Sequence, residues 1–186
     1  MEAIRKIGLN KIIKVILLAL AGTLLLTISA KVKNPFYPVP MTMQTFVVLL
    51  LGITLGRKIA LLTISLYLFE GIFGLPVFAG TPEKGIGIIY FTGPTMGYLI
   101  GFLIAAYSSG SFKYDKGFIN TFLKLIFSVS IIYILGLVWL GTLIGWDKPI
   151  FKLGAQPFLL AELFKILLLL FLLPNLLKIK KLIKII

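Results

Sequence analysis

Hydrophobic positions form long blocks along the chain, separated by short segments rich in charged residues, glycine or proline. A helix rises about 1.5 Å per residue and the hydrocarbon core of a bilayer is about 30 Å thick, so roughly 17–25 apolar residues cross it. We therefore predict an all-α integral membrane protein, a bundle of six transmembrane helices forming one domain over residues 1–186. The predicted helices cover residues 12–30, 44–56, 59–74, 86–107, 117–144 and 157–177.

The second block is the weakest of these predictions. At the same rise per residue, residues 44–56 extend only about 20 Å. The block ends at Gly56, Arg57 and Lys58, and the third block follows directly. An alternative with four or five spans treats residues 44–74 as a single tilted or re-entrant segment.

The basic residues are distributed unequally between the two ends of the predicted helices. The side of the termini carries Arg5, Lys6, Lys11, Lys14, Arg57, Lys58, Lys113, Lys116, Lys124, Lys178, Lys180, Lys181 and Lys184. The opposite side carries Lys31, Lys33, Lys84, Lys148, Lys152 and Lys165. Because cytoplasmic segments of membrane proteins are enriched in Lys and Arg, we predict that both termini are cytoplasmic.

Composition narrows the possible functions. With 59% hydrophobic and 13% charged residues, the chain has no hydrophilic domain and no Walker A motif for a nucleotide. Its formal charge of +13 lies between apolar blocks, which favours contact with anionic membrane lipid over nucleic acid. Uphill transport of a solute would therefore need an external source of energy.

The sequence has neither histidine nor cysteine, and Asp and Glu together number six. This removes imidazole bases, thiolate nucleophiles and the usual ligands of zinc, haem and iron–sulfur centres. Few groups remain for acid–base catalysis. We expect no metal, no cofactor and no enzymatic activity.

Glu162 and Lys165 are the most unusual polar residues, because ionisable side chains inside a membrane are costly and usually functional. They lie about 8 and 12 Å from the outer helix end at Pro157, and their i, i+3 spacing places them on one face. Lys165 precedes the apolar run 166–173, so its ammonium must reach outward or be paired inside the bundle. A helix pair that merely neutralises itself is the structural alternative.

Other polar groups gather near the same outer end. Glu70, at the end of the third block, is a possible partner for Lys165 or Lys84. Thr42 is a candidate N-cap of the second helix. Gln44 would face either the lipid headgroups or an inner cavity.

Two loops on the outer side have candidate roles. Residues 34–40 contain three prolines, which favour a stiff, non-helical cover. Phe36 and Tyr37 in this loop would stack on a ligand or anchor the loop at the membrane interface. Residues 71–87 are rich in glycine but also apolar, which suits part of a pocket wall.

Gly93, Gly97 and Gly101 recur every four residues within the fourth predicted helix. They therefore lie on one helical face and allow a neighbouring backbone to approach closely. This pattern predicts tight helix packing.

Several sequence blocks occur in a characteristic order: PVPMTMQTF at 38–46, LGITLGRK at 51–58, GLPVFAG at 74–80 and GPTMGYLIGF at 93–102. With Glu162 and Lys165 on the last helix, they resemble the BioY family, the biotin-specific substrate-binding (S) components of energy-coupling factor transporters. The likeness extends from about Val39 to Lys165. Glu162 stands where the family usually has Asp, and Met96 where it usually has Gly.

This resemblance implies a six-helix protein of a prokaryotic plasma membrane, with a pocket in the outer half that captures biotin from outside. Uptake would be driven by a transmembrane coupling subunit and two ATPase subunits. The implied ligand-binding residues are Glu162, Lys165, Gln44, Thr42, Tyr37, Phe36, Tyr67, Glu70 and Tyr90. The implied contact with the coupling subunit is the small-residue face at Ala19 and Thr23.

The chemistry of biotin suits such a pocket. Its apolar ring and chain would fill a mostly apolar cavity, and a carboxylate at residue 162 would accept from the ureido N–H groups. Lys165 would bind the biotin carboxylate or steady Glu162, and both roles remain open. The alternatives are a self-contained ion-coupled or facilitative transporter, with Glu162 or Glu70 titrating, and a membrane-embedded lipid-modifying enzyme.

Overall fold

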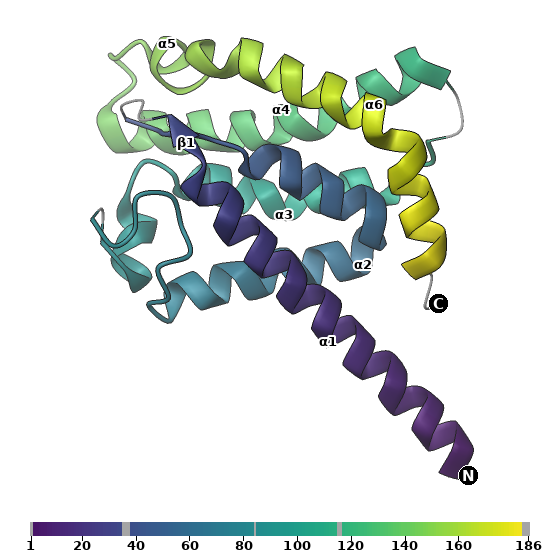
Figure 1. Cartoon of the computed structure of the whole chain (residues 1–186). Coiled ribbons are helices and arrows are strands. Elements are labelled where there is room, and N and C mark those ends of the chain that lie inside the picture. Colours follow the sequence, from purple (N-terminus) through teal and green to yellow (C-terminus); the bar gives the residue numbers. More distant parts are fainter. Residues whose placement is uncertain (1, 35–37, 84, 115–116, 184–186) are drawn as a thin grey trace.

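The computed structural model describes residues 2–34, 38–83, 85–114 and 117–183. Helices dominate these residues, and one short antiparallel pair of strands joins Lys33 to Thr42 and Asn34 to Met41 (Figure 1). The elements are α1 (Glu2–Lys31), β1 (Lys33–Asn34), β2 (Met41–Thr42), α2 (Gln44–Ile72), η1 (Gly87–Thr92), α3 (Met96–Ser111), α4 (Gly117–Ile144), α5 (Ile150–Gly154), η2 (Gln156–Phe158) and α6 (Leu159–Ile183).

α2 is a helical hairpin. Gly56 has φ 75° and ψ 166°, a conformation that glycine adopts without steric cost. The chain reverses direction there, so that the second half of α2 returns toward the end where the first half began (Figure 1). These halves correspond to the second and third predicted helices, and the alternative of one continuous tilted segment is wrong.

The described part of the chain therefore forms a bundle of six transmembrane helices: α1, the two halves of α2, α3, α4 and α6. Within these residues, four stretches are long and apolar enough to span a membrane by length and composition: Gly8–Lys31, Gln44–Ile72, Gly117–Ile144 and Ile150–Ile183. α3 has 16 residues and extends about 24 Å.

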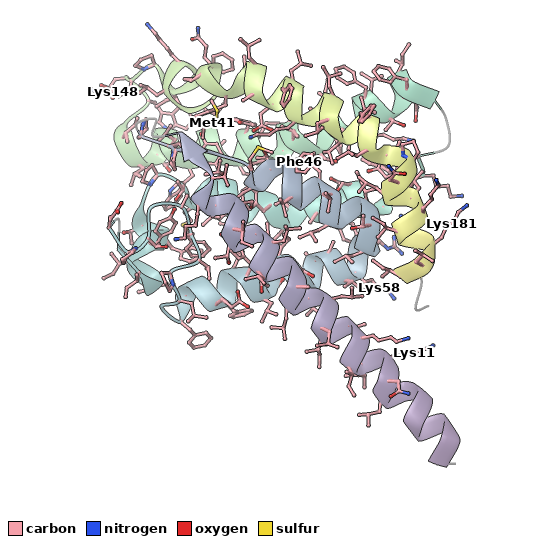
Figure 2. The ribbon with its side chains drawn as sticks, in the orientation of Figure 1. Lys11, Met41, Phe46, Lys58, Lys148 and Lys181 are labelled. Carbon is pink, nitrogen blue, oxygen red and sulfur yellow. The ribbon has the colours of Figure 1, made fainter. Side chains whose placement is uncertain are left out.

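Both termini lie at the same end of the bundle as the turn within α2, the end of α3 and the start of α4 (Figure 1). Lys11, Lys58 and Lys181 are found toward this end, and Lys148 toward the other (Figure 2). This arrangement agrees with the predicted topology, in which the end with the termini is cytoplasmic. The strands, η1 and α5 lie at the outer end.

The fourth helix was predicted at residues 86–107, and the first part of this prediction is wrong. Residues 87–92 form the short 3₁₀ helix η1, and the backbone becomes extended at Gly93, with φ −83° and ψ 175°. Pro94 disfavours a helical conformation in the residue before it, so α3 begins only at Met96. The sixth helix similarly begins at Leu159, because Pro157 lies in η2.

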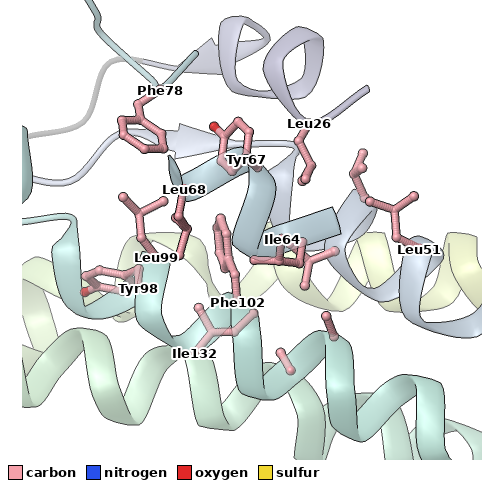
Figure 3. Close-up of a cluster of buried hydrophobic side chains, with 14 of the residues drawn as sticks. Leu26, Leu51, Ile64, Tyr67, Leu68, Phe78, Tyr98, Leu99, Phe102 and Ile132 are labelled. Atoms are coloured by element: carbon pink, nitrogen blue, oxygen red, sulfur yellow. The ribbon is translucent and has the colours of Figure 1, made fainter. Parts of the chain in front are cut away.

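Tight packing of α3 against α4 is confirmed at Gly97 and Gly101. A Cβ atom on either glycine would overlap the α4 backbone, at Leu135 and Ile132 respectively. Gly93 does not share this role, because it ends η1. Tyr67, Phe78, Leu99, Phe102 and Ile132 belong to one buried hydrophobic cluster (Figure 3).

Candidate ligand-binding site

Lys165 is buried near the start of α6, with 4% of its surface exposed. Its Nζ donates to Glu162 Oε1 at 2.7 Å, to Thr45 Oγ1 at 3.0 Å and to the Thr42 carbonyl at 2.6 Å. An ammonium group has three N–H bonds, and each has an acceptor here. The predicted pairing with Glu70 is therefore wrong, since Lys165 is paired with Glu162 on its own helix.

Glu162 is also buried, and its two carboxylate oxygens differ. Oε1 accepts from Lys165, from Thr45 Oγ1 at 2.9 Å and from Tyr133 OH at 3.1 Å. Oε2 is buried and has no hydrogen-bond partner among the described residues. A buried acceptor without a donor is energetically costly, so this oxygen is suited to bind a ligand N–H or O–H group.

A small cavity of about 50 Å³ lies beside Glu162 at the outer end of the bundle. Small-molecule sites commonly measure about 300–1,000 Å³, so the lining would have to move apart to admit a ligand of that size. Its polar lining is Thr42, Gln44, Thr45, Thr95 and Glu162, and its aromatic lining is Tyr90, Tyr98, Phe102, Tyr133 and Phe158. A mostly apolar cavity with a few polar groups suits an amphipathic ligand.

Lys165 does not line this cavity but a separate one, with Val32, Met43 and Phe164, between α1, the residues before α2, and α6. With its three N–H bonds already used, it holds Glu162 and Thr45 in place. Glu162 and Tyr133 also line an apolar groove between α4 and α6. The central cavity therefore meets the bilayer-facing groove at these two side chains.

Gln44 is oriented by its neighbours. Its Nε2 donates to Tyr67 OH at 2.8 Å, and Tyr67 in turn donates to the Val77 carbonyl at 3.0 Å. Thr42 Oγ1 donates to Gln44 Oε1 at 3.2 Å and accepts from the Gln44 backbone N–H at 3.3 Å. Gln44 thus faces the cavity and not the headgroups. Met43, rather than Thr42, is the N-cap residue of α2.

The outer wall is held by tyrosine hydroxyls. Tyr90 OH donates to the Ala79 carbonyl at 2.7 Å, and Tyr98 OH donates to the Gly154 carbonyl at 2.8 Å. Burial raises the pKa of Tyr90 above its ordinary value. Apolar residues 71–87 do contribute to the pocket wall, through Ala79.

Some predicted ligand-binding residues lie elsewhere. Tyr67 is completely buried behind Gln44 and does not line the cavity. Glu70 is half-buried and is likewise absent from the lining. Phe36, Tyr37 and Lys84 lie outside the described residues. From the same proline-rich loop, Val39 and Pro40 line the cavity.

Ala19 and Thr23 are not exposed on the surface of the bundle. Their exposed fractions are 2% and 3%, on the face of α1 that packs against α2. Gly22, on the same face, is so close to α2 that a Cβ atom there would overlap Thr63. The prediction that these residues are available to a coupling subunit is therefore wrong for this arrangement, because their small size serves packing within the chain.

The sequence-based prediction missed Thr45, Tyr98 and Tyr133. Thr45 directly follows Gln44, and Tyr98 lies in the GPTMGYLIGF block, so the neighbouring sequence could have identified both as candidate site residues. The sequence gives a weaker indication for Tyr133, which carries a hydroxyl group within the long apolar α4. That it contacts Glu162 depends on the packing of α4 against α6.

A cavity at the outer end of a helical membrane bundle, beside a buried carboxylate oxygen without a hydrogen-bond partner among the described residues, is typical of a solute-binding membrane protein. Comparison with known proteins identifies its family. The model of the BioY family matches residues 3–182, and the chain belongs to this family. Its members are transporters and not enzymes.

Two relatives agree with this assignment. The chain is 36% identical over 141 residues to the probable biotin transporter BioY of Pyrococcus horikoshii, covering 76% of this chain and 82% of the relative. It is 34% identical over 145 residues to the biotin transporter BioY of Thermotoga maritima, covering 77% and 84%.

A solved structure shows the same fold. It is the S-component for biotin from an ECF-type ABC transporter, with a TM-score of 0.73 and 21% sequence identity. The match covers 93% of this chain and 92% of the other. The chain is thus a multi-pass membrane protein of the BioY type.

Proposed function

We propose that this protein is a biotin-binding subunit that captures the vitamin from outside the cell and delivers it inward. The observation that carries the proposal is the buried Oε2 of Glu162, which has no hydrogen-bond partner among the described residues and lies beside a mostly apolar cavity. The names of the relatives support biotin as the ligand.

The ureido group of biotin has N–H donors, and Glu162 Oε2 would accept from one of them. The other carboxylate oxygen is held by three donors, so the acceptor is fixed before the ligand arrives. A hydrogen bond to a charged acceptor in a water-poor cavity is stronger than one between neutral groups. The aromatic lining would enclose the apolar ring.

Of the two roles for Lys165, steadying Glu162 has the better support. The ammonium lies outside the central cavity, and its N–H bonds are already used. It also supplies the charge that makes a buried carboxylate tolerable. The biotin carboxylate would then extend toward the outer mouth.

Energy for uptake would come from partner proteins. The sequence has no nucleotide-binding motif, and the structurally similar protein is the S-component of an ECF-type ABC transporter. We place this chain with a transmembrane coupling subunit and two ATPase subunits in a prokaryotic plasma membrane. Uptake by the chain alone, dependent on a proton gradient, would favour the ion-coupled alternative instead.

Calorimetric titration of the purified chain with biotin and with desthiobiotin tests the proposal. We expect saturable binding of one biotin per chain. Desthiobiotin keeps the ureido N–H groups but lacks the sulfur ring, so it should bind more weakly but still depend on Glu162. Absence of biotin binding by folded protein would refute the proposal.

A further inference from the structure

Lys31, in the last turn of α1, reaches across to a loop distant in sequence. Its Nζ lies 2.8 Å from the Pro76 carbonyl oxygen and 3.2 Å from the carbonyl oxygens of Phe78 and Thr81. Thr81 Oγ1 is a fourth acceptor, also at 3.2 Å. One ammonium group therefore joins the outer end of α1 to three residues of the same loop.

The loop concerned, residues 75–81, is called the wall loop here. Two further side chains bind its carbonyl groups: Tyr67 donates to Val77 and Tyr90 donates to Ala79. Donors from α1, α2 and η1 thus hold the wall loop from three directions. Of these donors, Lys31 carries the positive charge and contacts the most acceptors.

The wall loop forms one side of the ligand cavity. Ala79 lines the cavity, and the neighbouring Phe78 is buried with 1% of its surface exposed. The Phe78 ring packs on Tyr67, with a centroid distance of 5.2 Å (Figure 3). It also packs on Tyr90, with a centroid distance of 4.8 Å. A displacement of the wall loop would therefore move both the cavity lining and the aromatic cluster behind it.

α1 has an outer half that packs on the bundle and an inner half that projects beyond it (Figure 1). Ile12, Ile13, Ile16 and Leu17 of the inner half are exposed, whereas Leu26 and Ala30 of the outer half are buried. The helix is thus fastened at the end that holds the wall loop.

We infer that Lys31 is a positioning residue for the binding cavity: its ammonium fastens the wall loop to α1. A shift of α1 against the bundle then moves the wall of the cavity. The inference rests on the proposed function only for its effect on biotin, because the position of the wall loop can be measured without ligand.

The ligand-free test uses cysteine labelling, because the chain has no native cysteine. Ala79→Cys places a single thiol in the wall loop, where it is shielded from a polar maleimide. Adding Lys31→Met should raise the labelling rate about tenfold, because carbonyl groups that lose their donor favour exposure to water. Lys148→Met is the matched control, since Lys148 is an exposed lysine at the same end of the bundle. Equal labelling with and without Lys31→Met would overturn the inference.

The second measurement follows release of labelled biotin from the whole purified chain, well below the thermal midpoint of each variant. Lys31→Met should release biotin about tenfold faster than wild type, and Lys31→Arg should recover most of the difference. A lowered thermal midpoint with an unchanged release rate would reduce Lys31 to a structural role and overturn the inference. If wild type failed to bind biotin, the proposed function would fail, and the labelling result would still decide the role of Lys31.

Discussion

Replacement of Glu162 by glutamine tests the ligand contact with almost no change in shape. The amide oxygen can still accept from Lys165, Thr45 and Tyr133, as Oε1 does. The amide nitrogen then occupies the place of Oε2, where it is a donor and faces the donating ureido N–H of biotin. An acceptor is thus replaced by a donor at the one carboxylate atom left for the ligand.

The expected loss follows from these contacts. A hydrogen bond to a charged acceptor contributes about 1.5–3 kcal/mol, and a buried donor left without an acceptor costs a further 1–3 kcal/mol or so. Since each 1.4 kcal/mol or so is a tenfold change in affinity, Glu162→Gln should bind biotin roughly 10²–10⁴-fold more weakly. Glu162→Asp keeps the charge but shortens the reach, and it should retain more affinity than Glu162→Gln.

Calorimetric titration of both variants measures this difference, with thermal unfolding of the free protein as a control for folding. The glutamine variant also leaves Lys165 without its counter-charge, so its thermal midpoint should fall. A folded Glu162→Gln protein that binds biotin within about threefold of wild type would refute the assignment of Glu162 as a ligand.

Three further substitutions have defined outcomes. Lys165→Met leaves the buried Glu162 carboxylate without its cation, so it should destabilise the protein by about 3–5 kcal/mol and weaken biotin binding, measured by thermal unfolding and titration. Tyr133→Phe removes one donor to Glu162 at constant ring volume and should weaken binding by about 2–10-fold, with the fold retained. Gly101→Val forces a side chain into the α4 backbone and should lower the thermal midpoint by several degrees.

Each of these substitutions has a matched control in the chain. Lys148→Met removes an exposed lysine, and Tyr114→Phe removes a hydroxyl bound to the Ser109 carbonyl, away from the cavity. Gly8→Val introduces a side chain on α1 where a Cβ atom has no neighbour within 4 Å. If a control changed binding or stability as much as its counterpart, the structural reason given for that counterpart would be wrong.

The Glu162–Lys165 pair could be predicted from sequence because charge within an apolar helix is a strong local signal. The i, i+3 spacing is sufficient to place both residues on one face. The sequence did not predict that Glu162 faces the cavity while Lys165 holds Glu162 in place. These roles depend on Thr42 and Thr45, near the start of α2, which accept hydrogen bonds from Lys165.

The failure at Ala19 and Thr23 has a physical cause particular to membranes. In water, an amphipathic pattern distinguishes the core face of a helix from its solvent face. Lipid is as apolar as a protein core, so core-facing and lipid-facing positions of α1 have similar composition. Small residues then indicate close packing, but the sequence does not tell whether the partner is α2 or another protein.

The helix boundaries, too, could be predicted only in part from the sequence. Apolar blocks were sufficient to locate α4, which covers the predicted residues 117–144. The start of α3 depended on the backbone at Gly93 and Pro94, where an apolar run continues through a break in the helix. Hydrophobicity alone carries no information about such a break.

The central claim is that Glu162 accepts a hydrogen bond from the ureido group of biotin. The most direct test is a cycle of four titrations, in which wild type and Glu162→Gln each bind biotin and an analogue methylated at one ureido nitrogen. If the methyl group replaces the hydrogen of the N–H group that donates to Glu162, the losses of binding free energy from the substitution and from the methylation should not add. The coupling energy between them should then exceed about 1 kcal/mol. Strictly additive losses for analogues methylated at either nitrogen would contradict the claim.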